Sequence, residues 1–206
     1  MLAALAAVSA LVFAVLAWQV ATGGPLARLD VRVSGVFVRH QPVRLSEALA
    51  DLGTVVVAVP VLAAALGYAL ARRSWRGPLA AAVAMGAVPL FVMPLKALFA
   101  RPGPMGEPLG AYAGYFPSGH AATAAVAYGA SALVLLPLLR TRDSRRLLAA
   151  AAVVLVLGNG LGLVWRGYHW PLDVLASWCL AVVPLCAVAL VSPRISPRVS
   201  SRPRGR

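Results

Sequence analysis

The sequence contains six long stretches without a single charged residue, and this feature restricts its possible folds more than any other. An α-helix needs about 20 residues to cross a hydrocarbon core of about 30 Å. Core helices of soluble proteins are rarely so long and so uniformly apolar. The uncharged stretches span residues 1–27, 52–71, 77–95, 108–139, 147–165 and 174–193. We therefore predict an all-α integral membrane protein, a bundle of six transmembrane helices.

Composition excludes a soluble protein and agrees with this fold class. Hydrophobic residues make up 61% of the chain and charged residues 12%, whereas a soluble domain has about 25% charged residues. A secretory signal peptide is the alternative for the first stretch. That stretch lacks a basic start, however, and its apolar part exceeds the usual length of about 7–15 residues. We predict a retained helix.

Basic residues are unevenly distributed between the two sides of the predicted membrane. The net charge is +13, and 12 of the 19 basic residues lie in residues 72–76, 140–146 and 194–206. Cytoplasmic segments of membrane proteins carry excess Lys and Arg. We therefore predict a multi-pass cell-membrane protein with both termini in the cytoplasm. The bilayer explains the positive charge, so nucleic acid is not predicted as a partner.

Two regions fall outside the predicted bundle. We assign residues 1–193 to the transmembrane domain and residues 194–206 to a basic, disordered tail, because the tail has almost no apolar residues. Residues 28–47 have valines that partly alternate as in a strand, whereas Leu29, Val33 and Phe37 fit one face of a helix. Open strand edges do not occur in lipid, so we favour a helix at the membrane interface.

Polar residues near the apolar stretches fall into three groups on the predicted external side. An ionisable residue at membrane depth is costly and is by default a functional candidate. The groups are Lys96 with Arg101, Ser118 with Gly119 and His120, and Arg166 with His169 and Asp173.

These residue types indicate a phosphate site. Ser118 and Gly119 stand where a helix begins, and helix N-termini bind anions through free backbone N–H groups. Lys96, Arg101 and Arg166 can neutralise a phosphate dianion and the charge that builds up in its transfer.

The two histidines suggest a division of the chemistry. Asp173 lies four residues after His169, close enough on a helix to fix the tautomer and orientation of the imidazole. His169 is therefore the predicted nucleophile, which forms a phosphohistidine. His120, from another helix, is the predicted acid for the leaving group and the base for the attacking water.

The three groups resemble the signature motifs of the type 2 phosphatidic acid phosphatase family, Lys-x6-Arg-Pro, Pro-Ser-Gly-His and Ser-Arg-x5-His-x3-Asp. The second motif is intact at residues 117–120, and His169 and Asp173 preserve the end of the third. The resemblance covers residues from about 50 to 190. It implies a metal-independent membrane phosphatase with an external active site, the six-helix fold, His169 as nucleophile and His120 as acid.

The two arginines depart from the family pattern. The family's arginine positions fall on Gly103 and Leu163 in this chain, so Arg101 stands two residues early and Arg166 three residues late. Three helical residues correspond to about 4.5 Å along the axis, which a long side chain can largely span. Both remain predicted phosphate ligands.

The predicted function is hydrolysis of a lipid phosphomonoester or diphosphate at the extracytoplasmic face. Undecaprenyl diphosphate, phosphatidic acid and phosphatidylglycerophosphate are the candidate substrates. The chain has no Cys and His cluster with zinc-like spacing, so neither a metal nor another cofactor is predicted. The displaced arginines leave one alternative open, a degenerate family member that binds or transports lipid phosphates without turnover.

Overall fold

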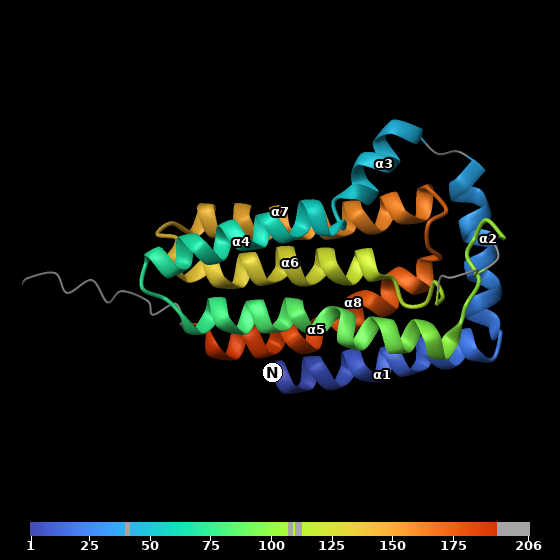
Figure 1. Cartoon of the computed structure of the whole chain (residues 1–206), viewed down its shortest axis with the longest axis horizontal. Helices are drawn as coiled ribbons and strands as arrows, with labels where there is room; N and C mark the ends of the chain where they lie inside the picture. The colour runs from blue at the N-terminus through green and yellow to red at the C-terminus, as the bar shows by residue number, and fades with distance from the viewer. Residues whose placement is uncertain (40–41, 107–108, 110–112, 193–206) are drawn as a thin grey trace, which may run out of the picture.

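The computed structural model of the protein describes residues 1–39, 42–106, 109 and 113–192, and all regular secondary structure within them is helical (Figure 1). The α-helices are α1 Leu2–Ala21, α2 Pro25–Arg39, α3 Val43–Asp51, α4 Val55–Ala71, α5 Arg76–Phe99, α6 Gly119–Leu135, α7 Arg142–Trp165 and α8 Pro171–Val191, and a 3₁₀ turn, η1 Leu136–Leu138, follows α6. The predicted all-α membrane fold class is confirmed.

Five or six segments of the described chain are long and apolar enough to cross a membrane. Helices α1, α5, α7 and α8 qualify singly, and α6 qualifies together with η1. The sixth candidate is a pair, because α3 and α4 meet at a break with a bend of 48°. The fourth predicted stretch is only partly helical, since α6 begins at Gly119 and not near residue 108. The protein is therefore a multi-pass membrane protein.

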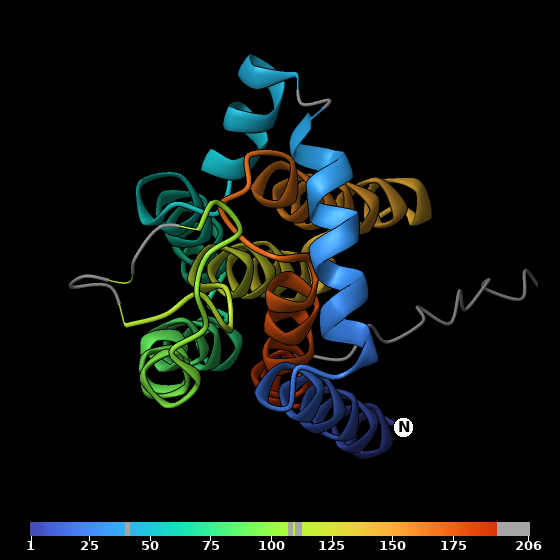
Figure 2. The same cartoon turned by 90° about the vertical axis from the view of Figure 1, so that its right-hand side faces the viewer.

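Helix α6 forms the centre of the bundle (Figure 2) and contacts α4, α5, α7 and α8. Its buried positions are mostly alanines, from Ala121 to Ala132. Small side chains let helix backbones approach closely, which favours association of helices within lipid. Helix α1 lies outside this group and packs against α8. The start of α6, which carries Ser118 to His120, is thereby surrounded by neighbouring helices.

Helix α2 crosses one end of the bundle, roughly perpendicular to the other helices (Figure 1). Leu29 and Val36 are exposed on its outer side, whereas Asp30 and Ser34 are buried. The strand interpretation of residues 28–47 is therefore wrong. The favoured helical interpretation holds for this segment, but it forms two helices, because α2 ends at Arg39 and α3 begins at Val43.

The break between α3 and α4 is fixed by α7 and α6. The Asn159 amide of α7 donates to the Ala50 carbonyl of α3 at 2.8 Å. A Cβ at Gly162 would overlap the backbone nitrogen of Ala50, and a Cβ at Gly53 would lie 2.5 Å from the carbonyl oxygen of His120. The two glycines thus permit a close approach that sets the break beside the start of α6.

The connections at the other end of the bundle are rich in arginine. They join α4 to α5 and α6 to α7, and they lie opposite the end that α2 crosses (Figure 1). The basic tail predicted for residues 194–206 lies outside the described residues, so that prediction and the boundary at 193 stay predictions.

Candidate active site

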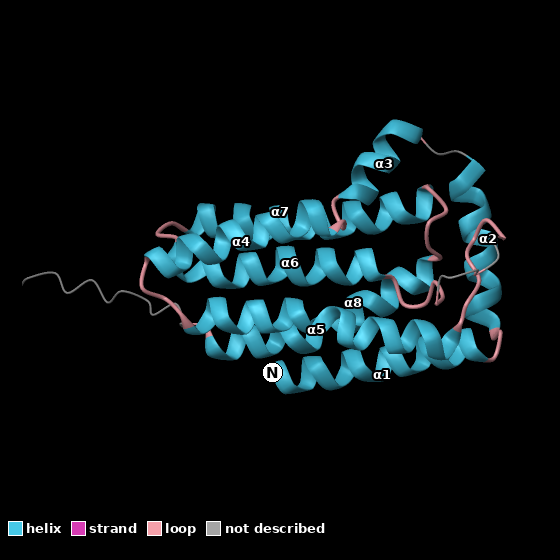
Figure 3. Cartoon of the chain, in the orientation of Figure 1, coloured by secondary structure: helices cyan, strands magenta, loops and turns pink. Residues whose placement is uncertain are grey.

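The end of α5, the start of α6 and the α7–α8 connection, which carry the three polar groups, lie at the end of the bundle that α2 crosses (Figure 3). Lys96 lies in the last turn of α5 and Ser118 caps α6. His169 lies in the connection from α7 to α8, and Asp173 in the first turn of α8. Long uncharged helices thus bring residues that are up to 77 positions apart, Lys96 and Asp173, to one side of the membrane domain.

His169 and Asp173 form a buried pair. The Nδ1 atom of His169 lies 3.3 Å from Oδ2 of Asp173, and the side chains are 4% and 0% exposed. The same carboxylate oxygen accepts the backbone N–H of Trp170 at 3.1 Å, which holds the start of α8. If Nδ1 carries the proton toward Asp173, Nε2 retains the lone pair that a nucleophile requires.

Burial lowers the pKa of His169, and the hydrogen bond and negative charge of Asp173 oppose that shift. Because burial is the larger influence, the imidazole stays neutral below its ordinary pKa of about 6.5. A neutral imidazole is the form that can attack phosphorus.

Arg101 connects this pair to α2. Its Nη1 donates to Oδ1 of Asp173 at 2.6 Å, and its Nη2 donates to Oδ2 of Asp30 at 2.8 Å. The guanidinium also lies over the ring of Trp170, with 5.1 Å to the centroid. The sequence analysis predicted Arg101 as a phosphate ligand, and the structure places it in an ion-pair chain between two carboxylates.

Asp30 is the residue of this cluster that the sequence analysis missed. Helix α2 is amphipathic, and Asp30 stands four residues before Ser34, the other fully buried position of that helix. The available signal was a single acid between Arg28 and Arg32, one helical turn from a small polar residue. Its partner could not be inferred, because Arg101 is 71 positions away in the sequence.

Ser118 anchors the N-terminus of α6. Its hydroxyl accepts the N–H of Ala121 at 3.2 Å, and its own N–H donates to the carbonyl of Asp173 at 3.2 Å. The Ser177 hydroxyl lies 2.8 Å from the Ser118 carbonyl oxygen and 2.7 Å from that of Asp173. The Ser118 N–H is therefore already engaged. The next two N–H groups, those of Gly119 and His120, belong to the first turn, where a helix leaves N–H groups without intrahelical partners.

Lys96 lies beneath this helix start. It is 3% exposed, and its Nζ donates to the carbonyl of Gly114 at 2.8 Å. A Cβ at Gly119 would lie 4.0 Å from its Cε, so the ammonium group and the start of α6 are neighbours. A cation and a helix N-terminus side by side form a favourable place for an anion.

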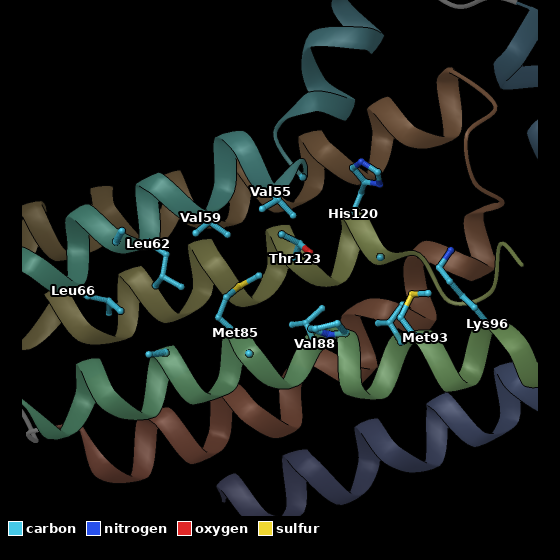
Figure 4. Close-up of a pocket in the computed structure, with 17 residues that line it drawn as sticks. Val55, Val59, Leu62, Leu66, Met85, Val88, Met93, Lys96, His120 and Thr123 are labelled. Carbon is cyan, nitrogen blue, oxygen red and sulfur yellow. The ribbon is translucent and has the colours of Figure 1, made fainter. Parts of the chain in front are cut away.

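A cavity of about 620 Å³ leads away from this place between α4, α5 and α6. Figure 4 shows Lys96 and His120 toward one end of it. The remaining lining is almost entirely apolar and includes Leu66 on α4 and Ala82 on α5. Lys96 and Ala82 are 14 residues apart on one helix, or about 21 Å along its axis. His120 is exposed to this cavity, in contrast to the buried His169.

Arg166 lies at the start of the α7–α8 connection, directly after the last residue of α7. Its guanidinium lies over the Tyr168 ring at 5.4 Å and donates to the Tyr168 hydroxyl at 3.5 Å. Leu163, which occupies the arginine position of the family pattern, is 1% exposed within an apolar cluster that includes Ala121 and Val174. No arginine side chain therefore comes from that position of α7.

Comparison with known proteins agrees with the fold and the motifs. The family model of the PAP2 superfamily matches residues 77–196, more than half of the chain. A crystal structure of a transmembrane PAP2-type phosphatidylglycerolphosphate phosphatase from Bacillus subtilis is similar, with a TM-score of 0.78 and 25% sequence identity. The match covers 89% of this chain and 93% of that one. No curated protein sequence matches the chain.

Proposed function

The chain belongs to the PAP2 superfamily, and from this premise we propose that it is a lipid phosphatase whose active site faces the extracytoplasmic side. Family and structural neighbour both support a phosphatase. The observation that supports a lipid as the substrate is the apolar cavity that has Lys96 and His120 at its polar end. A phosphate at that end would leave its hydrophobic chain in the cavity, within the depth of the bilayer.

The proposed reaction has two steps. Nε2 of His169 attacks phosphorus, a phosphohistidine forms, and the bond from phosphorus to the leaving oxygen breaks. His120 protonates that oxygen, which becomes the alcohol of the lipid or, for a diphosphate, the remaining phosphate. His120 then takes a proton from water, whose oxygen attacks phosphorus and releases inorganic phosphate together with free His169.

The charges around the phosphate support this mechanism. Lys96 can exchange its bond to the Gly114 carbonyl for a bond to a phosphate oxygen, and the N–H groups at the start of α6 face the same place. Asp173 stabilises the positive charge that develops on His169 during attack. Among the described residues, no three His, Cys, Asp or Glu side chains form a set that could hold a metal. We therefore propose hydrolysis without a metal or other cofactor.

The charge distribution supports the proposed extracytoplasmic position of the site. Arginine-rich connections lie at the end of the bundle opposite to the site, and such segments remain in the cytoplasm. The proposed topology therefore puts both termini in the cytoplasm. Cysteine-accessibility labelling of a residue in the α4–α5 connection, in intact cells and in lysed cells, tests it. Labelling of this residue in intact cells would contradict the proposed orientation.

The experiment for the activity is release of inorganic phosphate by the purified protein from a panel of lipid phosphates in EDTA. Phosphatidylglycerophosphate comes first, because the structural neighbour is described as acting on it, and phosphatidic acid and undecaprenyl diphosphate complete the panel. We expect turnover by the wild type and none by the His169→Ala and His120→Ala variants. The His40→Ala variant, which removes the third histidine of the chain, is the matched control. Wild-type turnover by His169→Ala would refute the mechanism.

A second candidate function is binding or transport of lipid phosphates without turnover. Two observations favour it, namely the buried Leu163 at the family's arginine position and the engagement of Arg101 by two carboxylates. Both reduce the number of cations available to a phosphate. Retention of a lipid phosphate by the wild type, with no phosphate release from any member of the panel, would support this candidate.

A further inference from the structure

A carboxylate on the crossing helix α2 reaches the catalytic pair through one arginine. Both oxygens of Asp30 are engaged, because Oδ1 accepts the backbone N–H of Leu172 at 2.9 Å and Oδ2 accepts Nη2 of Arg101 at 2.8 Å. The other arm of the same guanidinium holds Asp173, and Asp173 holds His169. An unbroken chain of polar contacts thus runs from α2 to the proposed nucleophile.

The packing of α2 against the bundle does not by itself explain why residue 30 is charged. Asp30 is 3% exposed, and burial raises its pKa, although Arg101 opposes that shift. Burying an ion pair is often no more stabilising than packing apolar residues of similar volume. The N–H of Leu172 near the start of α8 could be capped by a neutral serine or asparagine. The distinctive property of Asp30 is therefore its negative charge, which is directed at Arg101.

We propose that Asp30 is a positioning residue of the active site, which acts on His169 through Arg101 and Asp173. This inference rests on the proposed function, because it concerns the same nucleophile. In this arrangement Arg101 orients a carboxylate.

The electrostatic consequence concerns the charge on His169 during attack. Asp30, Arg101 and Asp173 together carry a net charge of about −1 when all are ionised. That charge favours the positive imidazole that forms when Nε2 bonds to phosphorus. Without Asp30, the guanidinium would neutralise Asp173 and could turn both of its arms toward that single carboxylate. The imidazole would then lose part of its stabilisation and its fixed orientation.

Loss of the Asp30 charge is expected to affect substrate binding differently from catalysis. Removing a negative charge near the site does not weaken attraction of a phosphate and can only strengthen it. We therefore expect Asp30→Asn to lower kcat while KM, and the inhibition constant of inorganic phosphate, stay equal or fall. A defect that merely loosened α2 would not separate kcat from KM in this way.

The experiment compares the full-length Asp30→Asn, Asp30→Glu and Asp143→Asn variants with the wild type. Loss of a hydrogen bond to a charged group changes a rate about tenfold or more, and we expect Asp30→Asn to lower kcat by about tenfold. Asp30→Glu, which retains the charge, should recover part of the loss. Asp143 is exposed at the far end of the bundle, on α7, so Asp143→Asn should match the wild type.

A second measurement does not depend on turnover. In detergent, 15N-histidine NMR reports the His169 ring, and its Nδ1–H resonance is assigned by its absence in His169→Ala. We expect that resonance to shift or broaden in Asp30→Asn and not in Asp143→Asn. An unchanged resonance together with an unchanged kcat in folded Asp30→Asn would overturn the proposal.

Two further results are equally decisive. If Asp30→Glu is as impaired as Asp30→Asn and both lose activity in proportion to their loss of folded protein, Asp30 only anchors α2 and the proposal fails. If the wild type releases no phosphate from any lipid, the proposed function fails. In that case the His169 resonance alone decides whether Asp30 positions the ring.

Discussion

Replacing Asp173 by Asn tests the centre of the active site with a change of almost no volume. The carboxylate is fully buried and accepts hydrogen bonds from Arg101 at 2.6 Å, His169 at 3.3 Å and the backbone of Trp170 at 3.1 Å. An amide keeps one acceptor oxygen, but it loses the negative charge that faces the imidazole. We expect the variant to bind substrate and to turn it over slowly.

The expected size of the effect follows from the contact to His169. A hydrogen bond to a charged group is worth about 1.5–3 kcal/mol, and about 1.36 kcal/mol corresponds to tenfold in rate. If the bond contributes only in the transition state, kcat falls about 10- to 160-fold. Removing one partner of a buried ion pair costs about 3–5 kcal/mol of stability when it leaves an unpaired charge. Arg101 retains Asp30, so the loss of unfolding free energy should be smaller than that.

The assay measures phosphate release at saturating lipid phosphate, with thermal unfolding of the same samples to show that they are folded. Asp143→Asn is the control, because its exposed carboxylate lies 3.7 Å from Arg146 and such surface pairs contribute about 0–1 kcal/mol. A folded Asp173→Asn protein with kcat within about twofold of the wild type would refute the role of Asp173 in orienting and stabilising His169.

Three other predictions test separate features. Gly114 has φ +144°, and a Cβ there would lie 2.6 Å from the Lys96 carbonyl oxygen. Denaturation of Gly114→Ala should therefore show an unfolding free energy at least about 1–3 kcal/mol lower than that of the wild type. Gly67 has open space around it, so Gly67→Ala should show no such loss. Burial lowers the pKa of His169, so an NMR titration should show the neutral ring persisting below pH of about 6.5, and protonation above that value would contradict the structure. Lys96→Gln should lower kcat/KM about 10- to 100-fold through the lost charge–phosphate contact, while Arg166→Gln should change it less than about threefold; equal losses in the two variants would place Arg166 in the phosphate site.

Local sequence patterns predicted the helices well because the bilayer imposes a simple rule. A helix satisfies its backbone hydrogen bonds within one segment, as a chain that crosses lipid must, so an uncharged stretch of about 20 residues predicts a helix. The uncharged stretches predict less well where each helix begins and ends. Residues 108–117 are uncharged like α6, and they precede its cap at Ser118. The 48° break between α3 and α4 depends on contacts with Asn159 and Gly162 of α7.

The contacts of the candidate site were likewise predictable only in part from the sequence. His169 and Asp173 are four residues apart, so the helical repeat alone predicted their contact, and the structure has it. Arg101 was also identified as a functional candidate, but its partners depend on how α2 and α8 approach the end of α5. Arg166 was predicted as a phosphate ligand, and in the turn after α7 its guanidinium lies over the Tyr168 ring. Side-chain direction after a helix end is set by such turns, which no spacing rule specifies.

The sequence by itself determined the class of protein and the histidine–carboxylate pair, because these follow from apolar length and helical periodicity. Only the tertiary structure decided which side chains pair with Arg101. Its guanidinium has two arms, and the distance between Asp30 and Asp173 in space, not their separation of 143 positions in the chain, allows both arms to be occupied. Ion pairs between residues so far apart in the sequence depend on where α2 and α8 pack relative to the end of α5, and helix packing is decided by the whole fold.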